Sequence, residues 1–169
     1  MKQFKILFLV LILALISACG YHLQGGGYLN DDITRVYVKV FENKSSETGA
    51  GVLFTNALVE EIIRVTDTKV VKESLADFVI EAQVNSITFS ILSRSTTDAV
   101  TERRATASVD LKIKDKNNDT VWSVKDFKSN EDYTVSDDNV LDESNKREAI
   151  DKVAVRSAEQ LVSRMLSNF

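Results

Sequence analysis

The sequence predicts an α+β fold, a two-layer sandwich with two helices packed on one face of a mostly antiparallel sheet of four to five strands. Three observations lead to this prediction. Several segments alternate apolar and polar residues with a period of two, which is typical of half-buried strands. Two longer segments repeat apolar residues at helical spacing. The order strand, helix, strands, helix allows both helices to cover one face of one sheet.

The first 18 residues have the pattern of a secretory signal. Lys2 and Lys5 precede an apolar run from Ile6 to Ile16, and small residues follow. The run has about 11 residues, well short of the roughly 20 that a bilayer-spanning helix needs. We therefore expect residues 1–18 to be a leader that is removed.

Cys19 is the only cysteine of the chain, so no internal disulfide is possible. Together with the residues before it, Ile16-Ser17-Ala18-Cys19 resembles the lipobox of bacterial lipoproteins. The resemblance implies acyl chains such as palmitate on Cys19, and two or more chains anchor a protein stably. Gly20 stands where lipoproteins kept in the inner membrane usually have Asp. The expected address is therefore the periplasmic side of the outer membrane.

Residues 19–30 are predicted to be a lipidated tether, because they contain three consecutive glycines, Gly25 to Gly27, which make a flexible joint. Residues 31–169 are predicted to form a single α+β domain. Its first strand should span residues 33–41, where Val36, Val38 and Val40 share one face. A polar loop should follow, then a helix from Val52 to Val65 and a short strand at 69–72.

The segment Phe78 to Leu92 is predicted to be an unusually long strand. Its apolar residues change parity half-way along, since Ile80 and Val84 are even-numbered whereas Ile87, Phe89 and Ile91 are odd-numbered. Either a bulge near Asn85-Ser86 restores the register, or the distal half buries its other face. We further hypothesise that the distal half leaves the core and meets another molecule.

The rest of the chain is predicted to be a hairpin, a loop and a helix. Residues 105–114 alternate cleanly, Lys116–Asp119 has turn chemistry, and residues 120–128 return as the partner strand. Residues 129–143 are rich in acids and are expected to be a solvated loop. Ser144 or Asn145 would then cap the final helix, with Met165 in the core.

The residues available for chemistry are few. The chain is mildly acidic, with a net charge of −4, which argues against nucleic acid as a partner. His22 is the only histidine and falls in the tether, so no Ser/His/Asp set and no His/Cys metal site can be built on the domain. The acidic pairs Asp137-Asp138 and Asp142-Glu143 lack calcium-loop spacing. We expect no enzyme activity, no metal and no cofactor.

Arginines near one predicted hairpin are the most distinctive charged group. Arg94, Arg103 and Arg104 flank the Ser/Thr-rich stretch Ser93–Thr101. Arginine forks match the geometry of phosphate, so this tip could bind an anionic lipid head group. The alternative interpretation is that these charges, with Lys112 and Lys114, discourage edge-to-edge strand pairing.

Several motifs of the mature chain resemble the LPS-assembly lipoprotein family LptE, in the same order and over nearly the whole length. They are Cys19-Gly20-Tyr21-His22-Leu23, Val38-Lys39-Val40-Phe41-Glu42-Asn43, the helix 53–64, Ala76-Asp77-Phe78-Val79-Ile80-Glu81 and Ala158-Glu159-Gln160-Leu161. The resemblance implies two helices on a four-stranded sheet and a role as a plug in the outer-membrane barrel LptD, which places lipopolysaccharide in the outer leaflet. It also implies lipopolysaccharide contact near the middle hairpin, which maps onto Arg94.

A second, fainter resemblance gives a different function. The segment Phe41-Glu42-Asn43-Lys44-Ser45 before an apolar helix resembles periplasmic lipoproteins that activate a peptidoglycan synthase or form part of a secretion pore. Such a protein would bind a synthase or assemble into rings, whereas an LptE-like protein would be isolated with a barrel. The identity of the partner therefore discriminates between the two functions.

Overall fold

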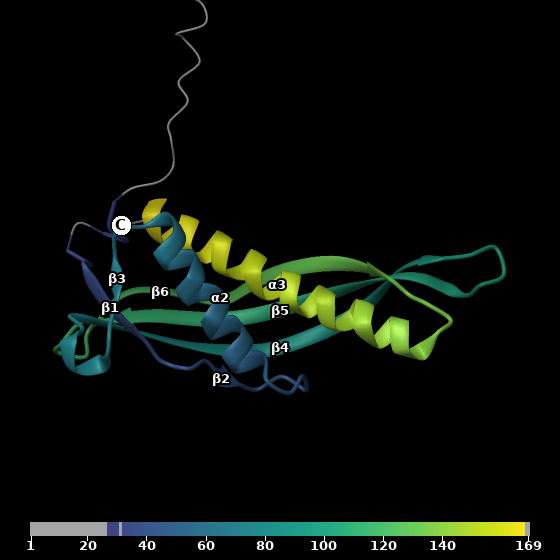
Figure 1. Cartoon of the computed structure of the whole chain (residues 1–169), viewed down its shortest axis with the longest axis horizontal. Coiled ribbons are helices and arrows are strands. Elements are labelled where there is room, and N and C mark those ends of the chain that lie inside the picture. Colours follow the sequence, from purple (N-terminus) through teal and green to yellow (C-terminus); the bar gives the residue numbers. More distant parts are fainter. Residues whose placement is uncertain (1–26, 31, 168–169) are drawn as a thin grey trace, which may run out of the picture.

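The computed structural model describes residues 27–30 and 32–167, which form one sheet with two helices on one of its faces (Figure 1). The strands run in the spatial order β3-β1-β4-β5-β6, and β2 pairs with β4 beyond the end of β1. The elements are β1 (Arg35–Val38), β2 (Glu42–Asn43), α2 (Ala50–Val65), β3 (Lys69–Val70), η1 (Glu73–Leu75), β4 (Phe78–Arg94), β5 (Val100–Lys114), β6 (Thr120–Thr134) and α3 (Asn139–Ser167). The predicted class, α+β with both helices on one face, is confirmed.

The sheet is mixed and six-stranded, whereas a mostly antiparallel sheet of four to five strands was expected. β4, β5 and β6 form an antiparallel meander. However, β1 pairs in parallel with both β3 and β4, and β2 pairs in parallel with β4. Parallel neighbours need a crossover connection, and the segment that contains α2 and η1 supplies it.

The predicted strand 33–41 is interrupted. Val38 lies opposite Ile80 and Glu42 lies opposite Gln83, so this segment uses one residue more than β4 over the same distance. The extra residue turns Val40 outward, where 64% of its surface is exposed. Phe41 is then buried beside α2, and its N–H donates to the Thr55 hydroxyl at 2.9 Å.

The parity change in β4 is produced by a bulge, as one of the two sequence interpretations predicted. The register with β5 shifts between Val84 and Ser86. Ile80, Val84 and Ile87 are consequently all buried on the helix-covered face. The bulged Asn85 donates to the Asp110 carboxylate at 2.8 Å, and the N–H of Asp126, which lies at a second irregularity in β6, donates to the same oxygen at 2.8 Å.

The predicted acidic loop 129–143 is wrong. β6 continues to Thr134, and α3 begins at Asn139 rather than after a cap at Ser144 or Asn145. Asp138 takes the capping role, since its Oδ1 accepts from the N–H groups of Val140 at 2.8 Å and Leu141 at 3.2 Å. The acidic residues of β6 gave this segment the composition of a loop. The strand accommodates them because basic side chains pair with them, as Arg156 does with Glu131 at 2.7 Å.

The core lies between the sheet and the two helices. α2 contributes Phe54, Leu58 and Ile62, each almost without exposed surface. α3 contributes Leu161 and Met165, so the expectation that Met165 is a core residue is confirmed. A chain of this size with such a core needs no disulfide for stability.

We predict that Gly51→Ala destabilises the protein. Gly51 lies in the first turn of α2, where an added Cβ would overlap the carbonyl oxygen of Phe41, so helix and strand would have to separate. The expected loss in the free energy of unfolding is about 1–3 kcal/mol, measured by urea denaturation followed by circular dichroism. Val52→Ala, at an exposed neighbouring position, should change it by no more than about 0.5 kcal/mol. Equal stability of the two variants would contradict this account of the glycine.

Candidate functional site

The β4–β5 hairpin projects beyond both helices at one end of the molecule (Figure 1). Its turn closes where Ser95 N–H donates to the carbonyl of Ala99 at 2.8 Å, with Asp98 in the left-handed conformation at φ 66°. The Ser95 hydroxyl accepts from the N–H of Thr97 and of Ala99. The tip is therefore an ordered turn built from short polar side chains.

Arg94 lies at the base of this turn. Its Nη1 donates to the Asp98 carbonyl at 2.9 Å and lies 3.5 Å from the Asp98 carboxylate. The arginine side chain nevertheless keeps 45% of its surface exposed. Arg94 can therefore help to shape the turn while still presenting N–H donors to an external anion.

Arg103 and Arg104 point to opposite faces of the sheet, because successive side chains of a strand alternate. Arg104 is on the open face and forms a bidentate pair with Asp132, at 2.7 and 2.9 Å. This pairing raises the pKa of the guanidinium and lowers that of the carboxyl. Arg103 is on the helix-covered face, and within the described part of the chain it has no carboxylate partner. The three predicted arginines therefore do not form one cluster.

Apolar side chains accompany the arginines at this end. Ile91 and Leu92, at the distal end of β4, are 48% and 42% exposed. At the start of α3, Val140 and Leu141 are 82% and 53% exposed. The hypothesis that the distal half of β4 leaves the core holds only for its last residues, because Ile87 is buried and Phe89 packs against the core, whereas Ile91 and Leu92 are exposed. Arginine N–H donors beside exposed aliphatic groups suit a ligand that carries both phosphate and hydrocarbon.

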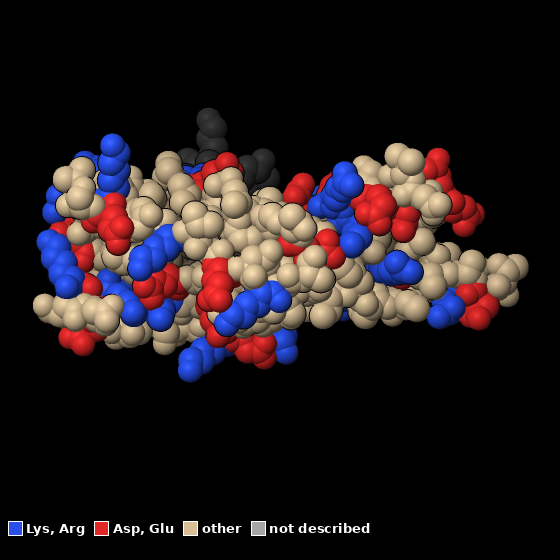
Figure 2. Space-filling view, turned by 90° about the horizontal axis from the view of Figure 1, so that it is seen from below, with Lys and Arg blue, Asp and Glu red and all other residues tan. Residues whose placement is uncertain are grey.

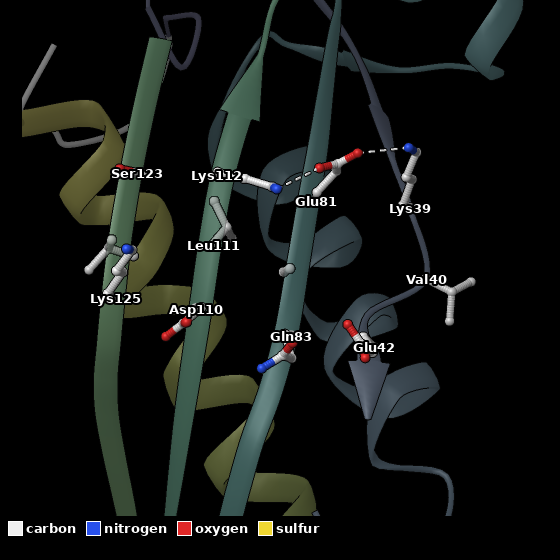
Figure 3. A pocket seen from close by; sticks show the side chains of 12 residues that line it. Lys39, Val40, Glu42, Glu81, Gln83, Asp110, Leu111, Lys112, Ser123 and Lys125 are labelled. Atoms are coloured by element: carbon white, nitrogen blue, oxygen red, sulfur yellow. Dashed lines mark hydrogen bonds and ion pairs between the residues drawn. The ribbon is translucent and has the colours of Figure 1, made fainter. Parts of the chain in front are cut away.

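A second candidate lies on the open face of the sheet, where a shallow cavity of about 350 Å³ runs across β4, β5 and β6 (Figure 3). Glu81 is its central charge. Its carboxylate contacts the amino groups of Lys39 at 2.8 Å, Lys112 at 3.0 Å and Lys114 at 3.2 Å. These contacts, led by Lys39, lower the pKa of Glu81 to about 2.

Next to this cluster, Asp77 contacts Arg35 and Lys116, at 2.8 and 2.7 Å, and its pKa is likewise lowered to about 2. A carboxylate held ionised in this way cannot exchange a proton near neutral pH, which a general acid or base must do. These ion pairs tie β1 to β4 and the β5–β6 turn. Their geometry supports a structural role for the open face.

The acidic residues before α3 are used locally. Asp138 caps the helix, and Asp142 Oδ1 accepts from the Ser136 N–H at 3.2 Å. Over residues 27–30 and 32–167, no three His, Cys, Asp or Glu side chains are placed to hold a metal ion. Cys19, His22 and the predicted leader lie outside the described residues.

Charges of both signs are interspersed on the surface, as Figure 2 shows for the side on which β2 and β4 lie. Of the helices in the described part of the chain, neither combines the length and apolarity needed to cross a bilayer.

Comparison with known proteins shows the family and the fold of this chain. A model of the family LptE, described as lipopolysaccharide-assembly, matches residues 33–165, which includes all of the strands and most of α3. The chain belongs to the LptE family. It is therefore of the lipoprotein, lipopolysaccharide-assembly kind, as the sequence motifs indicated. No curated protein matches the chain.

Two solved structures show the same fold. The solution structure of lipoprotein B from Nitrosomonas europaea is 19% identical, with a TM-score of 0.60 over 88% of this chain and 91% of that one. A crystal structure of a Caulobacter crescentus protein is 16% identical, with a TM-score of 0.55 over 76% of this chain and 88% of that one. At these identities the similarity supports the architecture alone.

We predict that Glu81→Gln lowers stability at pH 7 and flattens its dependence on acid. Because the folded pKa is below the usual value of 4.5, the carboxylate stabilises the fold above that pH, and this contribution is lost as the pH falls toward 2. With 24% of the side chain exposed, the loss at pH 7 should be about 1 kcal/mol after solvent screening. Urea denaturation at pH 7, 5 and 3 measures it. Glu60→Gln, at an exposed position on α2, is the control and should leave the pH profile unchanged.

Proposed function

We propose that this chain is a non-catalytic outer-membrane lipoprotein that assembles with the LptD barrel, plugs it, and helps deliver lipopolysaccharide to the outer leaflet. The observation that carries the proposal is the LptE family match over residues 33–165. In this proposal residues 1–18 are a cleaved leader, Cys19 carries the acyl chains, and residues 31–169 are one domain on the periplasmic side. The acyl chains supply the membrane attachment.

The shape and surface of the molecule support a role inside a barrel. One sheet and one helix layer give a slab roughly 20 Å thick, which fits only the lumen of a large barrel of the plugged kind. The open face of the sheet presents paired ions and amides rather than an apolar surface, as at Glu81 and its lysines. Such a face is compatible with a polar barrel interior.

The hairpin end supports lipopolysaccharide contact. Arg94 and Arg103 have N–H donors available for phosphate, and Ile91 and Leu92 provide aliphatic surface beside them. Arg104 is less suited, because Asp132 already satisfies its guanidinium in a bidentate pair. We therefore assign the phosphate contacts to Arg94 and Arg103, and give Arg104 a role within the sheet.

The alternative function, synthase activation or a secretion pore, rested on residues 41–45. In the structure these residues form β2 and the turn after it. Asn43 Nδ2 donates to the Glu47 carbonyl at 2.9 Å, and its Oδ1 accepts from the Ser45 N–H at 3.0 Å. The polar groups of the segment are thus used to hold the turn before α2. No observation on this structure favours the alternative.

The proposal predicts that LptD is the main partner of the native protein. The full-length chain, tagged at its carboxyl end, would be purified from detergent-solubilised membranes and its partners identified. We expect LptD at a constant ratio, and a mass spectrum of the same sample that begins at Cys19 with acyl chains attached. A bare thiol or an uncut leader would remove the anchor from the proposal. Recovery of a peptidoglycan synthase, or of rings of this chain, in place of LptD would favour the alternative.

The assignment of phosphate contacts predicts different effects for neighbouring arginines. Arg94→Glu combined with Arg103→Glu should weaken lipopolysaccharide binding at least about tenfold, because two charge-assisted contacts become repulsive. Arg104→Ala should change it by less than about twofold. Binding would be measured with purified variants and labelled lipopolysaccharide, with Lys69→Glu combined with Lys72→Glu, at exposed positions in and after β3, as the charge-matched control. A loss with Arg104→Ala as large as that of the double variant would contradict the assignment.

A further inference from the structure

The two long edges of the sheet differ in how well their backbone groups are protected from pairing with another strand. β6 is an edge over its full length, and β4 becomes one beyond Val84, where its pairing with β2 ends. We call residues Ser86–Ser93 of β4 the β4 free edge. An open edge presents backbone N–H and C=O groups that can template pairing with another strand, and natural proteins usually block such edges.

The edge formed by β6 is blocked in two ways. Its middle carries three charged residues, Lys125, Asp126 and Lys128. Asp126 also has a left-handed backbone conformation, with φ 48°. Its distal half is covered by side chains of α3. Arg156 donates to the carbonyl of Asn130 at 2.9 Å, and Asn145 donates to the carbonyl of Thr134 at 2.9 Å. An additional strand would have to displace these contacts.

The β4 free edge lacks charged residues and a left-handed residue, and within the described part of the chain no side chain of α3 bonds to its backbone. No charged residue occurs from Ala82 to Ser93, and the chain has no proline. Figure 2 looks at the molecule from this side, and at its right-hand end basic and acidic groups lie beside a band of uncharged surface. The segment is rich in β-branched and aromatic residues, which favour strand pairing. The edge at β6 is therefore blocked against strand pairing, whereas the β4 free edge is open to it.

The alternation of hydrogen bonds identifies the groups that point outward. The carbonyl of Asn130 accepts from Arg156 of α3 and therefore points away from β5. Asn130 and the residue opposite it on β5, Thr106, are consequently not hydrogen-bonded to each other. The backbone N–H and C=O of Thr106 instead point toward Thr88 of β4. The outward residues of β4 are then the odd-numbered ones, Ile87, Phe89 and Ile91. Among residues 27–30 and 32–167, no strand other than β5 pairs with β4 here.

The helix layer continues over this edge. Lys146 of α3 lies 4.8 Å from the ring centre of Phe89 and contacts Glu47 at 3.0 Å, so α3 crosses the β4 side of the sheet toward its amino end (Figure 1). The first turn of α3 then exposes Val140 and Leu141. A strand beside β4 would place every second side chain on this helix-covered side, against aliphatic surface.

We propose that the β4 free edge accepts an extended segment of the barrel partner as an additional β-strand. Only another polypeptide backbone offers donors and acceptors at the two-residue spacing of this edge, so neither a sugar nor a phosphate can occupy it. We expect the strand added by the barrel to be uncharged, with apolar side chains toward α3 alternating with polar side chains toward the open face. The inference rests on the proposed function, because the barrel is the protein that contributes the strand.

A backbone substitution separates edge pairing from side-chain contact. Ile91→Pro removes an N–H that points away from β5, so the ladder between β4 and β5 is kept. Ile91→Ala shortens the same side chain and keeps the N–H. In full-length lipoprotein co-expressed with LptD, we expect the proline variant to retain roughly five- to tenfold less barrel than the alanine variant. Circular dichroism and thermal unfolding would show whether both variants are folded.

A second pair of variants adds a charge without changing the backbone. Thr88→Lys places a lysine on the β4 free edge at an exposed position of the open face, and Ser123→Lys places one at an exposed position of β6. We expect Thr88→Lys to reduce barrel retention and Ser123→Lys to leave it unchanged. Hydrogen exchange of the wild-type complex should slow at least tenfold for the amides of Ile87, Phe89 and Ile91, compared with the lipoprotein alone.

The outcomes distinguish this inference from the proposed function. A complex that forms normally with both proline and lysine variants, and whose residues 86–93 exchange as fast as in the free chain, overturns the strand addition and leaves the barrel assignment standing. If wild-type lipoprotein retains no LptD, the proposed function is wrong and the inference is lost with it. Concentration-dependent protection of the edge in the lipoprotein alone would assign the edge to a second copy of this chain, and would also overturn the inference.

Discussion

The bulge at Asn85 is the constraint on which the arrangement of this molecule depends. β4 is 17 residues long and pairs with β5 over almost its whole length. Without the extra residue, its distal apolar side chains would face solvent while its polar ones faced the helices. Asn85 occupies the bulge and shares Asp110 with the backbone of Asp126, so β4, β5 and β6 are connected at the same level. Because of the bulge, Ile87 and Phe89 stay on the helix-covered face as β4 runs toward the hairpin.

Periodicity in the sequence was sufficient for the helices, for β4 and β5, and for the existence of the bulge, because each of these has one clearly apolar face. It failed where acids occupy strand positions. Glu131 and Asp132 have the composition of a loop, yet their partners are Arg156 and Arg104, at distant positions of the chain. Parallel pairing of β1 and β2 with β4 was also missed, since alternation predicts a strand but not its neighbour or direction.

For the candidate site, the sequence identified residue types better than their arrangement. The Arg94–Arg104 region was found because arginines flank an uncharged turn. Alternation alone already places Arg103 and Arg104 on opposite faces, but the bidentate pair of Arg104 with Asp132 joins residues 28 positions apart and depends on the register of β5 with β6. The exposed Val140 and Leu141 could not be anticipated, because the start of α3 was placed too late.

The parallel pairing of β1 with β4 also constrains the order in which the chain can fold. Arg35 and Asp77, which join the two strands, are 42 positions apart, whereas the β4–β5–β6 meander is built from neighbours in sequence. Contacts between distant positions form late, because a long loop must close first. β1 and α2 precede β4, the strand that completes their core, in the chain. Until β4 pairs with β1, apolar residues of this amino-terminal part such as Phe54 and Leu58 stay exposed to association with other molecules.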